Sequence, residues 1–262
     1  MDKQNLLCLS LGAYIGASLR LEIVSTYTNY FNDDIIPIDM FDNFLGSFVI
    51  GFYNDRYKIK DLSSHLAIST GFCGCLTTFS SWMLGSIKLA NSEQWLNCLI
   101  NIFLGFIIAY SGFKLGQNAE IEFKFLFHKK LLYLAFLKII IFQAIFKKWN
   151  MIITALLSPF GAFLRFQISK LNHKNFPFGT LICNSLAVWI AQLLILSTLQ
   201  FDTDDSKIVK SILKGFCGSL STVSTWIKEI CTMQSIELRF IYFWISLFLS
   251  LYIGLIICQS LF

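Results

Sequence analysis

The sequence predicts an all-α polytopic membrane protein in which a connecting transmembrane helix joins two inverted four-helix domains. Three observations lead to this fold class. Of 262 residues, 55% are hydrophobic and only 14% are charged, whereas a soluble domain carries about 25% charged residues. The apolar residues lie in long blocks, and the first half of the chain recurs in the second half. The composition argues against an aqueous enzyme, a disordered chain and a secreted disulfide scaffold.

The apolar blocks predict about nine spans, at roughly 20 residues for each helical crossing. They lie near residues 6–26, 40–54, 63–86, 95–115, 131–147, 150–170, 178–199, 209–227 and 240–261. The first block runs on to Val24 and carries Arg20, so we interpret it as a retained span rather than a cleavable signal peptide. The fifth block is short and has Lys138 at its middle, so it either crosses with that lysine snorkelling or facing the bundle, or lies along the interface.

A repeat relates the two halves of the chain. The segment GASLR at 16–20 recurs as GAFLR at 161–165, and GFCGCLTTFSSW at 71–82 recurs as GFCGSLSTVSTW at 215–226. The repeat predicts a first domain over 1–116, a linker with the connecting helix over 117–148, and a second domain over 149–262. A single connecting span inverts the second half, and inverted repeats form their binding site near the membrane midplane between the halves.

Charge sets the expected orientation. Most basic residues of the first half, among them Lys3, Arg56 and Lys114, fall on one side, while Asp33, Asp34 and Asp39 fall on the other. The positive-inside rule therefore predicts a cytoplasmic N-terminus. The second half has no bias of its own, so its inversion depends on the fifth helix crossing.

The two recurring polar runs, 71–82 and 215–226, are costly in lipid unless they face protein or a water-filled path. Close packing of helices through small residues would account for one such run. Two copies in inverted halves favour helices that break at the midplane, where freed carbonyls could cage a cation.

These motifs resemble the Fluc/FEX fluoride channel family, and the fused two-half arrangement is similar to its eukaryotic form. The resemblance rests on GFCGCLTTFSSW, on GAxxR in both halves and on Asn-x-x-Gly at Asn43, and it covers most of the chain outside about 117–148. It implies an antiparallel pair of domains whose broken third helices cross at the centre. It also implies a structural Na⁺ held there by the backbone carbonyls of Gly74, Thr77, Gly218 and Ser221.

The resemblance further implies a fluoride path, which the two halves keep unequally. The second half keeps the expected polar residues Thr180, Asn184, Ser246 and Ser250, whereas the first half has Asp39, Asn43, Asn97 and Asn101 in their places. The family has two aromatic positions on the third helix. The first position holds Phe79 in the first half and Val223 in the second, and the second position holds Trp82 and Trp226. An Asp on an anion path repels the ion. We therefore expect one working pore, along the second-half track with Phe79 as its aromatic partner.

These residue types suit a small, strongly hydrated anion, because amide, hydroxyl and ring-edge donors can replace its water. Arg20 and Arg165, with Glu229, are the expected vestibule residues. The arginines either raise the local anion concentration at the pore mouths or act as snorkelling anchors.

The predicted function is passive, fluoride-selective export from the cytoplasm across the plasma membrane, which protects against fluoride toxicity. We expect no catalytic site, because His65, His128 and His173 are scattered, and no nucleic-acid partner, because the basic residues flank apolar blocks. The expected partners are fluoride and the lipid bilayer, and the fused chain should act as a monomer. The alternatives are a proton-coupled small-cation transporter with inverted four-helix repeats, which would need a midplane carboxylate, and a non-transporting scaffold.

Overall fold

The structure is a computed structural model that describes the chain except residues 31–38, 57–61, 120–128, 174, 201–205 and 260–262. The described residues are almost entirely helical, with one isolated bridge between Asn172 and Pro177. Seven helices are uninterrupted and longer than 15 residues: α1 (Lys3–Tyr30), α2 (Met40–Arg56), α6 (Trp95–Asn118), α7 (Lys129–Ile145), α8 (Trp149–Ile168), α9 (Phe178–Gln200) and α13 (Ile236–Gln259).

The third and eighth predicted spans are chains of short helices. In the first half these are α3 (Leu62–His65), the π-helix η1 (Leu66–Cys73), α4 (Gly74–Leu76) and α5 (Phe79–Asn91). In the second half they are α10 (Ser206–Ile212), the π-helix η3 (Leu213–Cys217), α11 (Gly218–Leu220) and α12 (Val223–Thr232). A 3₁₀ turn, η2 (Ser169–Leu171), follows α8. π-Helical turns are rare in proteins, and those that occur often lie at functional sites.

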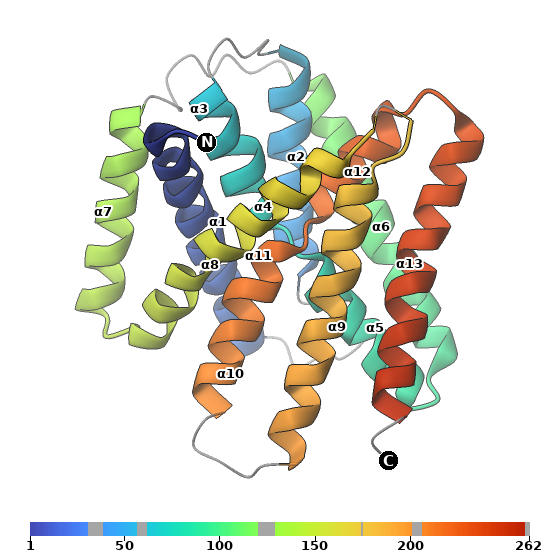
Figure 1. The fold of residues 1–262 in the computed structure, drawn as a ribbon. Coiled ribbons are helices and arrows are strands. Elements are labelled where there is room, and N and C mark those ends of the chain that lie inside the picture. The colour runs from blue at the N-terminus through green and yellow to red at the C-terminus, as the bar shows by residue number, and fades with distance from the viewer. Residues whose placement is uncertain (31–38, 57–61, 120–128, 174, 201–205, 260–262) are drawn as a thin grey trace.

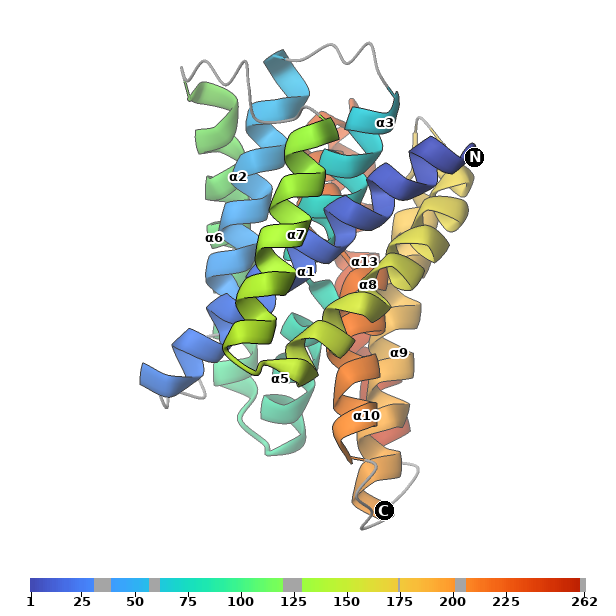
Figure 2. The same ribbon diagram turned by 90° about the vertical axis from the view of Figure 1, so that its left-hand side faces the viewer.

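The two halves run in opposite directions and interlock. In Figure 1 the chain begins at the top and ends at the bottom, with α1 descending and α8 ascending past it. Figure 2 shows α1 and α8 crossing, with α7 against α1. Within each half, α2 packs on α6 and α9 packs on α13. The helices after the breaks pack on the opposite half, α5 on α9 and α13, and α12 on α2 and α6.

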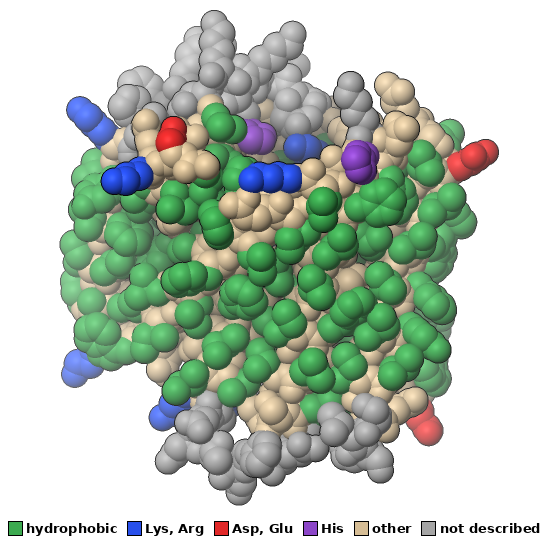
Figure 3. Space-filling view, viewed as in Figure 1, with side chains coloured by type: hydrophobic (Ala, Val, Ile, Leu, Met, Phe, Trp, Pro, Cys, Tyr) green, Lys and Arg blue, Asp and Glu red, His purple; other side chains and the backbone are tan. Residues whose placement is uncertain are grey.

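Five helices of the described chain are long and apolar enough to cross a membrane: α1, α6, α8, α9 and α13. Helices α2 and α7 have 17 residues each, and the two broken segments lack a continuous helix of sufficient length. Figure 3 shows hydrophobic side chains over the middle of the visible face, with basic and acidic side chains near its two ends and histidines near the upper end. This distribution is typical of a protein whose middle band faces the hydrocarbon core of a membrane.

Most predicted spans are shorter than the helices. The third segment continues to Asn91 rather than 86, the eighth to Thr232 rather than 227, and the last helix begins at Ile236 rather than 240. The predicted spans end where the apolar residues end. The helices are longer because their backbone hydrogen bonds continue beyond the apolar stretch. The fifth segment forms α7, where Lys138 is exposed rather than turned into the bundle. The hydroxyl of Tyr14 on α1 donates to Oε1 of Gln143 at 2.9 Å, which fixes α7 against the first half.

Candidate functional site

Each broken helix is interrupted by two residues in extended conformation. Thr77 and Thr78 have φ, ψ of −90°, 147° and −139°, 120°, and Ser221 and Thr222 have −87°, 161° and −157°, 134°. Thr78 and Thr222 then act as N-caps, because each hydroxyl accepts from the backbone N–H three residues later. Threonine is a preferred N-cap residue, so the Thr-Thr and Ser-Thr pairs end one helix and begin the next.

Hydroxyl groups from one half cap the helix of the other half at the crossing. Oγ1 of Thr77 accepts from the backbone N–H of Ser224 at 3.1 Å, and Oγ of Ser221 accepts from the backbone N–H of Ser80 at 3.0 Å. The hydroxyls of Ser80 and Ser221 lie 3.0 Å apart, and those of Thr77 and Ser224 also lie 3.0 Å apart. All four residues are buried. The two breaks are therefore held together by reciprocal bonds between the halves.

The two asparagines of the predicted path each bridge a break. Asn184 accepts from the N–H of Thr222 at 2.8 Å and donates to the Thr222 carbonyl at 3.1 Å. Asn43 makes the same pair of bonds to Thr78, at 2.9 Å and 3.4 Å. An amide nitrogen carries two N–H groups, and these bonds use one. Each asparagine thus fixes its break and keeps a second donor.

The two arginines lie inside the protein and reach across to the opposite broken helix. Arg165 is 4% exposed; its Nη1 donates to the carbonyls of Gly74 and Ser221 at 2.7 Å and 2.8 Å, and its Nη2 donates to the Thr70 carbonyl at 2.5 Å. Arg20 is 3% exposed, and its Nη2 donates to the Lys214 carbonyl at 2.5 Å. Neither arginine is a surface anchor, so that alternative is wrong.

The carbonyls of Gly74 and Ser221 face one point, because a single nitrogen of Arg165 contacts both. They belong to the four-carbonyl set predicted to hold Na⁺. Carbonyl oxygens suit a hard cation, and each has a second lone pair. Two of the four predicted ligands therefore converge, and the Arg165 guanidinium already supplies a positive charge to both.

On the second-half track, two of the three hydroxyls donate to protein groups. Thr180 donates to Oε1 of Glu229 at 2.7 Å, and Ser246 donates to the Tyr242 carbonyl at 2.7 Å while accepting from Trp226 Nε1 at 3.1 Å. Glu229 also accepts from Asn172 and from the Tyr242 hydroxyl. Ser250 differs, because its hydroxyl is buried with no hydrogen-bond partner among the described residues. It is therefore a free donor on this track.

The corresponding first-half positions are occupied by protein contacts or by a buried acidic side chain. Trp82 Nε1 donates to the Asn101 carbonyl at 3.1 Å, and the Ser86 hydroxyl donates to the Asn101 side-chain oxygen at 3.0 Å. Asn97 is partly exposed and donates to Gln94. Asp39 and Asp42 are buried, and both carboxylate oxygens of Asp42 lack a partner among the described residues. This half lacks the hydroxyl track of the other.

The aromatic residues from the two halves meet in one buried cluster. The Phe79 ring lies edge-on to Trp82 and Trp226, with centroids 5.5 Å and 5.4 Å away, and the two indoles lie 6.0 Å apart. Phe79 begins α5, which packs on α9 and α13 of the second half. A Cβ at Gly254 of α13 would lie 2.3 Å from Ile87 of α5, so this glycine permits the close approach. The helix that Phe79 begins thus packs against the two helices that carry Asn184 and Ser250.

Sequence reasoning missed several residues of this site. Tyr242 and Asn172 bind Glu229, and Ser86 binds Asn101. The only available signal for Tyr242 was its position four residues before Ser246, which places both on one face of α13. For Asn172, which lies outside the helices, no local signal was present.

The comparison with protein families decides the assignment. The family described as CrcB-like protein, Camphor Resistance (CrcB), matches residues 7–117 and again residues 152–259. The chain belongs to the CrcB family. Arg20, Asn43 and Phe79 lie in the first CrcB segment, Arg165 and the second-half track lie in the second, and α7 lies between the two. The chain is thus a fusion of two CrcB domains.

Individual CrcB relatives match about one half of the chain. The fluoride-specific ion channel FluC of Campylobacter jejuni is 37% identical over 114 residues, which are 41% of this chain and 93% of the relative. Those of Methanococcus aeolicus and Methanococcus maripaludis are 36% identical over 104 residues and 32% identical over 129 residues. These cover 38% and 46% of this chain and 82% and 98% of the relatives. No solved structure matches the chain at the level of significance applied to these relatives.

Proposed function

We propose that this CrcB protein is a passive fluoride channel that exports the ion from the cytoplasm and protects the cell against fluoride. The single observation that carries the proposal is the CrcB match in both halves, with relatives named fluoride-specific ion channels. The site supports it: Ser250 and the second N–H of Asn184 are donors that can replace the water of a small anion. A negative interior favours anion exit by roughly 2.3 kcal/mol per 100 mV, so the channel needs no coupling ion.

The proposal includes the finer topology and location. The antiparallel course of α1 and α8 and the basic residues of the first half support nine spans in two inverted domains with a cytoplasmic N-terminus. The domains would comprise 1–116 and 149–262 in the plasma membrane, and the fused chain would function as a monomer. Site-specific labelling of single-cysteine variants from each side of the membrane tests this arrangement.

A growth experiment tests the function. Cells that lack the gene should stop growing at a fluoride concentration well below that tolerated by the parent strain, and acidic medium should increase the difference because more fluoride enters as HF. Unchanged tolerance would instead fit the proton-coupled cation transporter or a non-transporting scaffold.

Ser250→Ala should separate conduction from stability. The substitution breaks no hydrogen bond of the described structure, so the free energy of unfolding should change by less than about 0.5 kcal/mol. Fluoride efflux should fall roughly tenfold, because a hydrogen bond to an ion contributes about 1.5–3 kcal/mol. Fluoride-electrode recordings on liposomes, together with unfolding in detergent, measure both quantities.

The matched control is Ser246→Ala, which leaves the Trp226 N–H without its acceptor. It should lower the unfolding free energy by about 1–3 kcal/mol. If fluoride efflux through Ser250→Ala were normal, the Ser250 hydroxyl would not be part of the fluoride path.

We also propose that Na⁺ binds between the carbonyls of Gly74, Thr77, Gly218 and Ser221, beside Arg165. If it stabilises the crossing, replacing all Na⁺ by N-methyl-D-glucamine should lower the unfolding temperature, by about 3 °C for each kcal/mol of binding free energy. Arg165→Gln removes the protein's own cation and should make the dependence on Na⁺ steeper. An unfolding temperature that is equal in both salts would mean that the guanidinium alone satisfies these carbonyls.

A further inference from the structure

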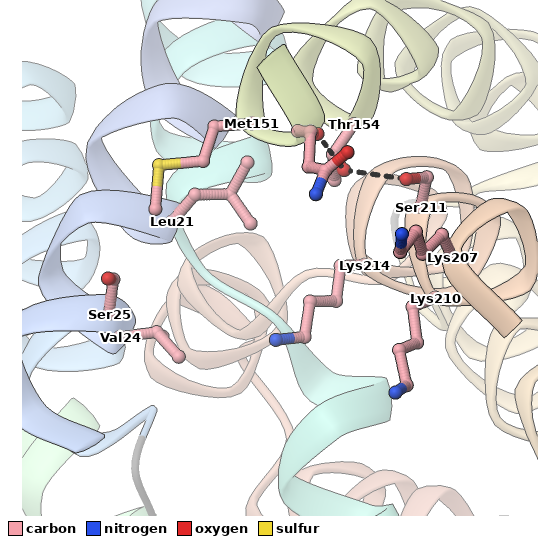
Figure 4. Close-up of a pocket in the computed structure, with 10 residues that line it drawn as sticks. Leu21, Val24, Ser25, Met151, Thr154, Lys207, Lys210, Ser211 and Lys214 are labelled. Atoms are coloured by element: carbon pink, nitrogen blue, oxygen red, sulfur yellow. Dashed lines mark hydrogen bonds between the residues drawn. The ribbon is translucent and has the colours of Figure 1, made fainter. Parts of the chain in front are cut away.

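A pocket of about 290 Å³ lies outside the fluoride track, between α1, α8 and the start of the second broken helix. Figure 4 shows its two unlike sides. Leu21, Val24 and Met151 form an apolar side, while Lys207, Lys210 and Lys214 face them from α10 and η3. The amine of Lys214 projects toward Val24 across the space between the two sides.

The three lysines form one charged face. They are spaced three and four residues apart, which places them on the same side of a helix. None forms a salt bridge with a carboxylate of the described residues, and all three are exposed. The Thr154 hydroxyl donates to the Asn150 carbonyl at 2.6 Å and lies 3.0 Å from the Ser211 hydroxyl beside the lysines. Among the described residues the pocket therefore has three lysine amines at one end, with Asp39 in the pocket next to Lys214, and apolar surface at the other.

The charged face is particular to the second half. Counting back from the matched glycines Gly71 and Gly215, the first-half positions that correspond to the three lysines hold Ser63, Leu66 and Thr70. The arginine contacts confirm this register, because Arg165 binds the Thr70 carbonyl as Arg20 binds the Lys214 carbonyl. The first half forms its helix break without lysines at these positions. The lysines are therefore not needed to form the break.

The size and chemistry of the pocket select the ligand. A monatomic anion would fill only a small part of 290 Å³, whereas an oxyanion can accept hydrogen bonds from several ammonium groups at once. The ammonium groups suit an anionic headgroup, and the apolar side could contact the first carbons of a lipid. We propose that this pocket binds a phosphate group, supplied by an anionic phospholipid or by free phosphate.

The pocket adjoins a second one. Lys214 also lines a neighbouring pocket of about 260 Å³ together with Arg20, Asp39 and Ser81. Asp39 is the first-half counterpart of Thr180, so this second pocket lies at the first-half track and outside the proposed working path.

Native mass spectrometry of the full chain tests the binding step independently of fluoride transport. Dioleoylphosphatidylglycerol should be retained at least tenfold more than dioleoylphosphatidylcholine. The triple variant Lys207→Gln, Lys210→Gln, Lys214→Gln should lose this preference. The triple variant Lys130→Gln, Lys138→Gln, Lys147→Gln, which changes the net charge equally at exposed positions on and next to α7, should keep it.

Inorganic phosphate, measured by its effect on the unfolding temperature, distinguishes the two sources. Stabilisation by phosphate with no preference between the lipids would assign the pocket to free phosphate. Equal retention of both lipids together with no effect of phosphate would overturn the proposal. So would a preference that survives the pocket triple variant. If that variant does not fold, Lys210→Gln alone should reduce the preference, and the lipid comparison on the parent chain still decides.

Discussion

Asn184→Asp should abolish fluoride efflux, whereas Asn43→Asp should reduce it several-fold at most. Both substitutions keep the oxygen that accepts from the backbone N–H of the break, and both lose the donor to the carbonyl of the same residue. The structural costs are therefore matched. The difference comes from position, because only Asn184 lies on the proposed working path. There a carboxylate about 4 Å from the ion opposes it by about 4 kcal/mol at an effective dielectric constant near 20, or roughly a thousandfold.

Fluoride efflux from liposomes, recorded at equal protein density, measures the difference between the two variants. Size-exclusion profiles and unfolding curves of both variants provide the control for folding. Equal loss from the two variants would mean that both halves conduct. No loss from either would remove the asparagines from the path and would contradict the one-pore proposal.

Arg165→Met should destabilise the protein strongly and more than Arg20→Met. The Arg165 guanidinium is buried and donates to three carbonyls at the crossing, those of Thr70 and Gly74 in the first broken helix and that of Ser221 in the second. Removing a buried charged donor leaves those acceptors without it, at a cost of about 4 kcal/mol for the set. Arg20 donates to one carbonyl in the described structure, so its loss should cost about 2 kcal/mol.

Unfolding of the purified variants in mixed micelles, followed by tryptophan fluorescence, measures these free energies. Arg165→Lys keeps the charge but not the fork that reaches several carbonyls, so its stability should fall between those of the parent and Arg165→Met. If the two methionine variants were equally stable, the carbonyl contacts of Arg165 would contribute little.

Much of this fold could be predicted from local features. Apolar blocks mark the nine helical segments, because a helix in lipid needs a continuous run of apolar side chains. The recurrence of 71–82 at 215–226 predicts the two breaks, because glycines followed by hydroxyl residues both weaken a helix and begin a new one. The CrcB match over 7–117 and 152–259 agrees with the repeat.

The site could be predicted only in part. The residue types of the second-half track are visible in the sequence, but their hydrogen bonds are not. Thr180 and Ser246 are donors by type, yet Glu229 and the Tyr242 carbonyl accept their protons, which leaves Ser250 as the free hydroxyl. Such a distinction depends on neighbours from other turns and other helices.

The sequence by itself determined that this chain is a doubled, helical membrane protein with a break in each third helix, because those properties follow from composition and local pattern. Only the tertiary structure decided which half of the protein each of these side chains contacts. Arg165 reaches Gly74 of the opposite half, Thr77 caps the helix that begins at Val223, and Phe79 lies against Trp226. The physical reason is that these contacts join residues 91 to 147 positions apart. Their geometry is set by how the two halves pack, which no local pattern specifies.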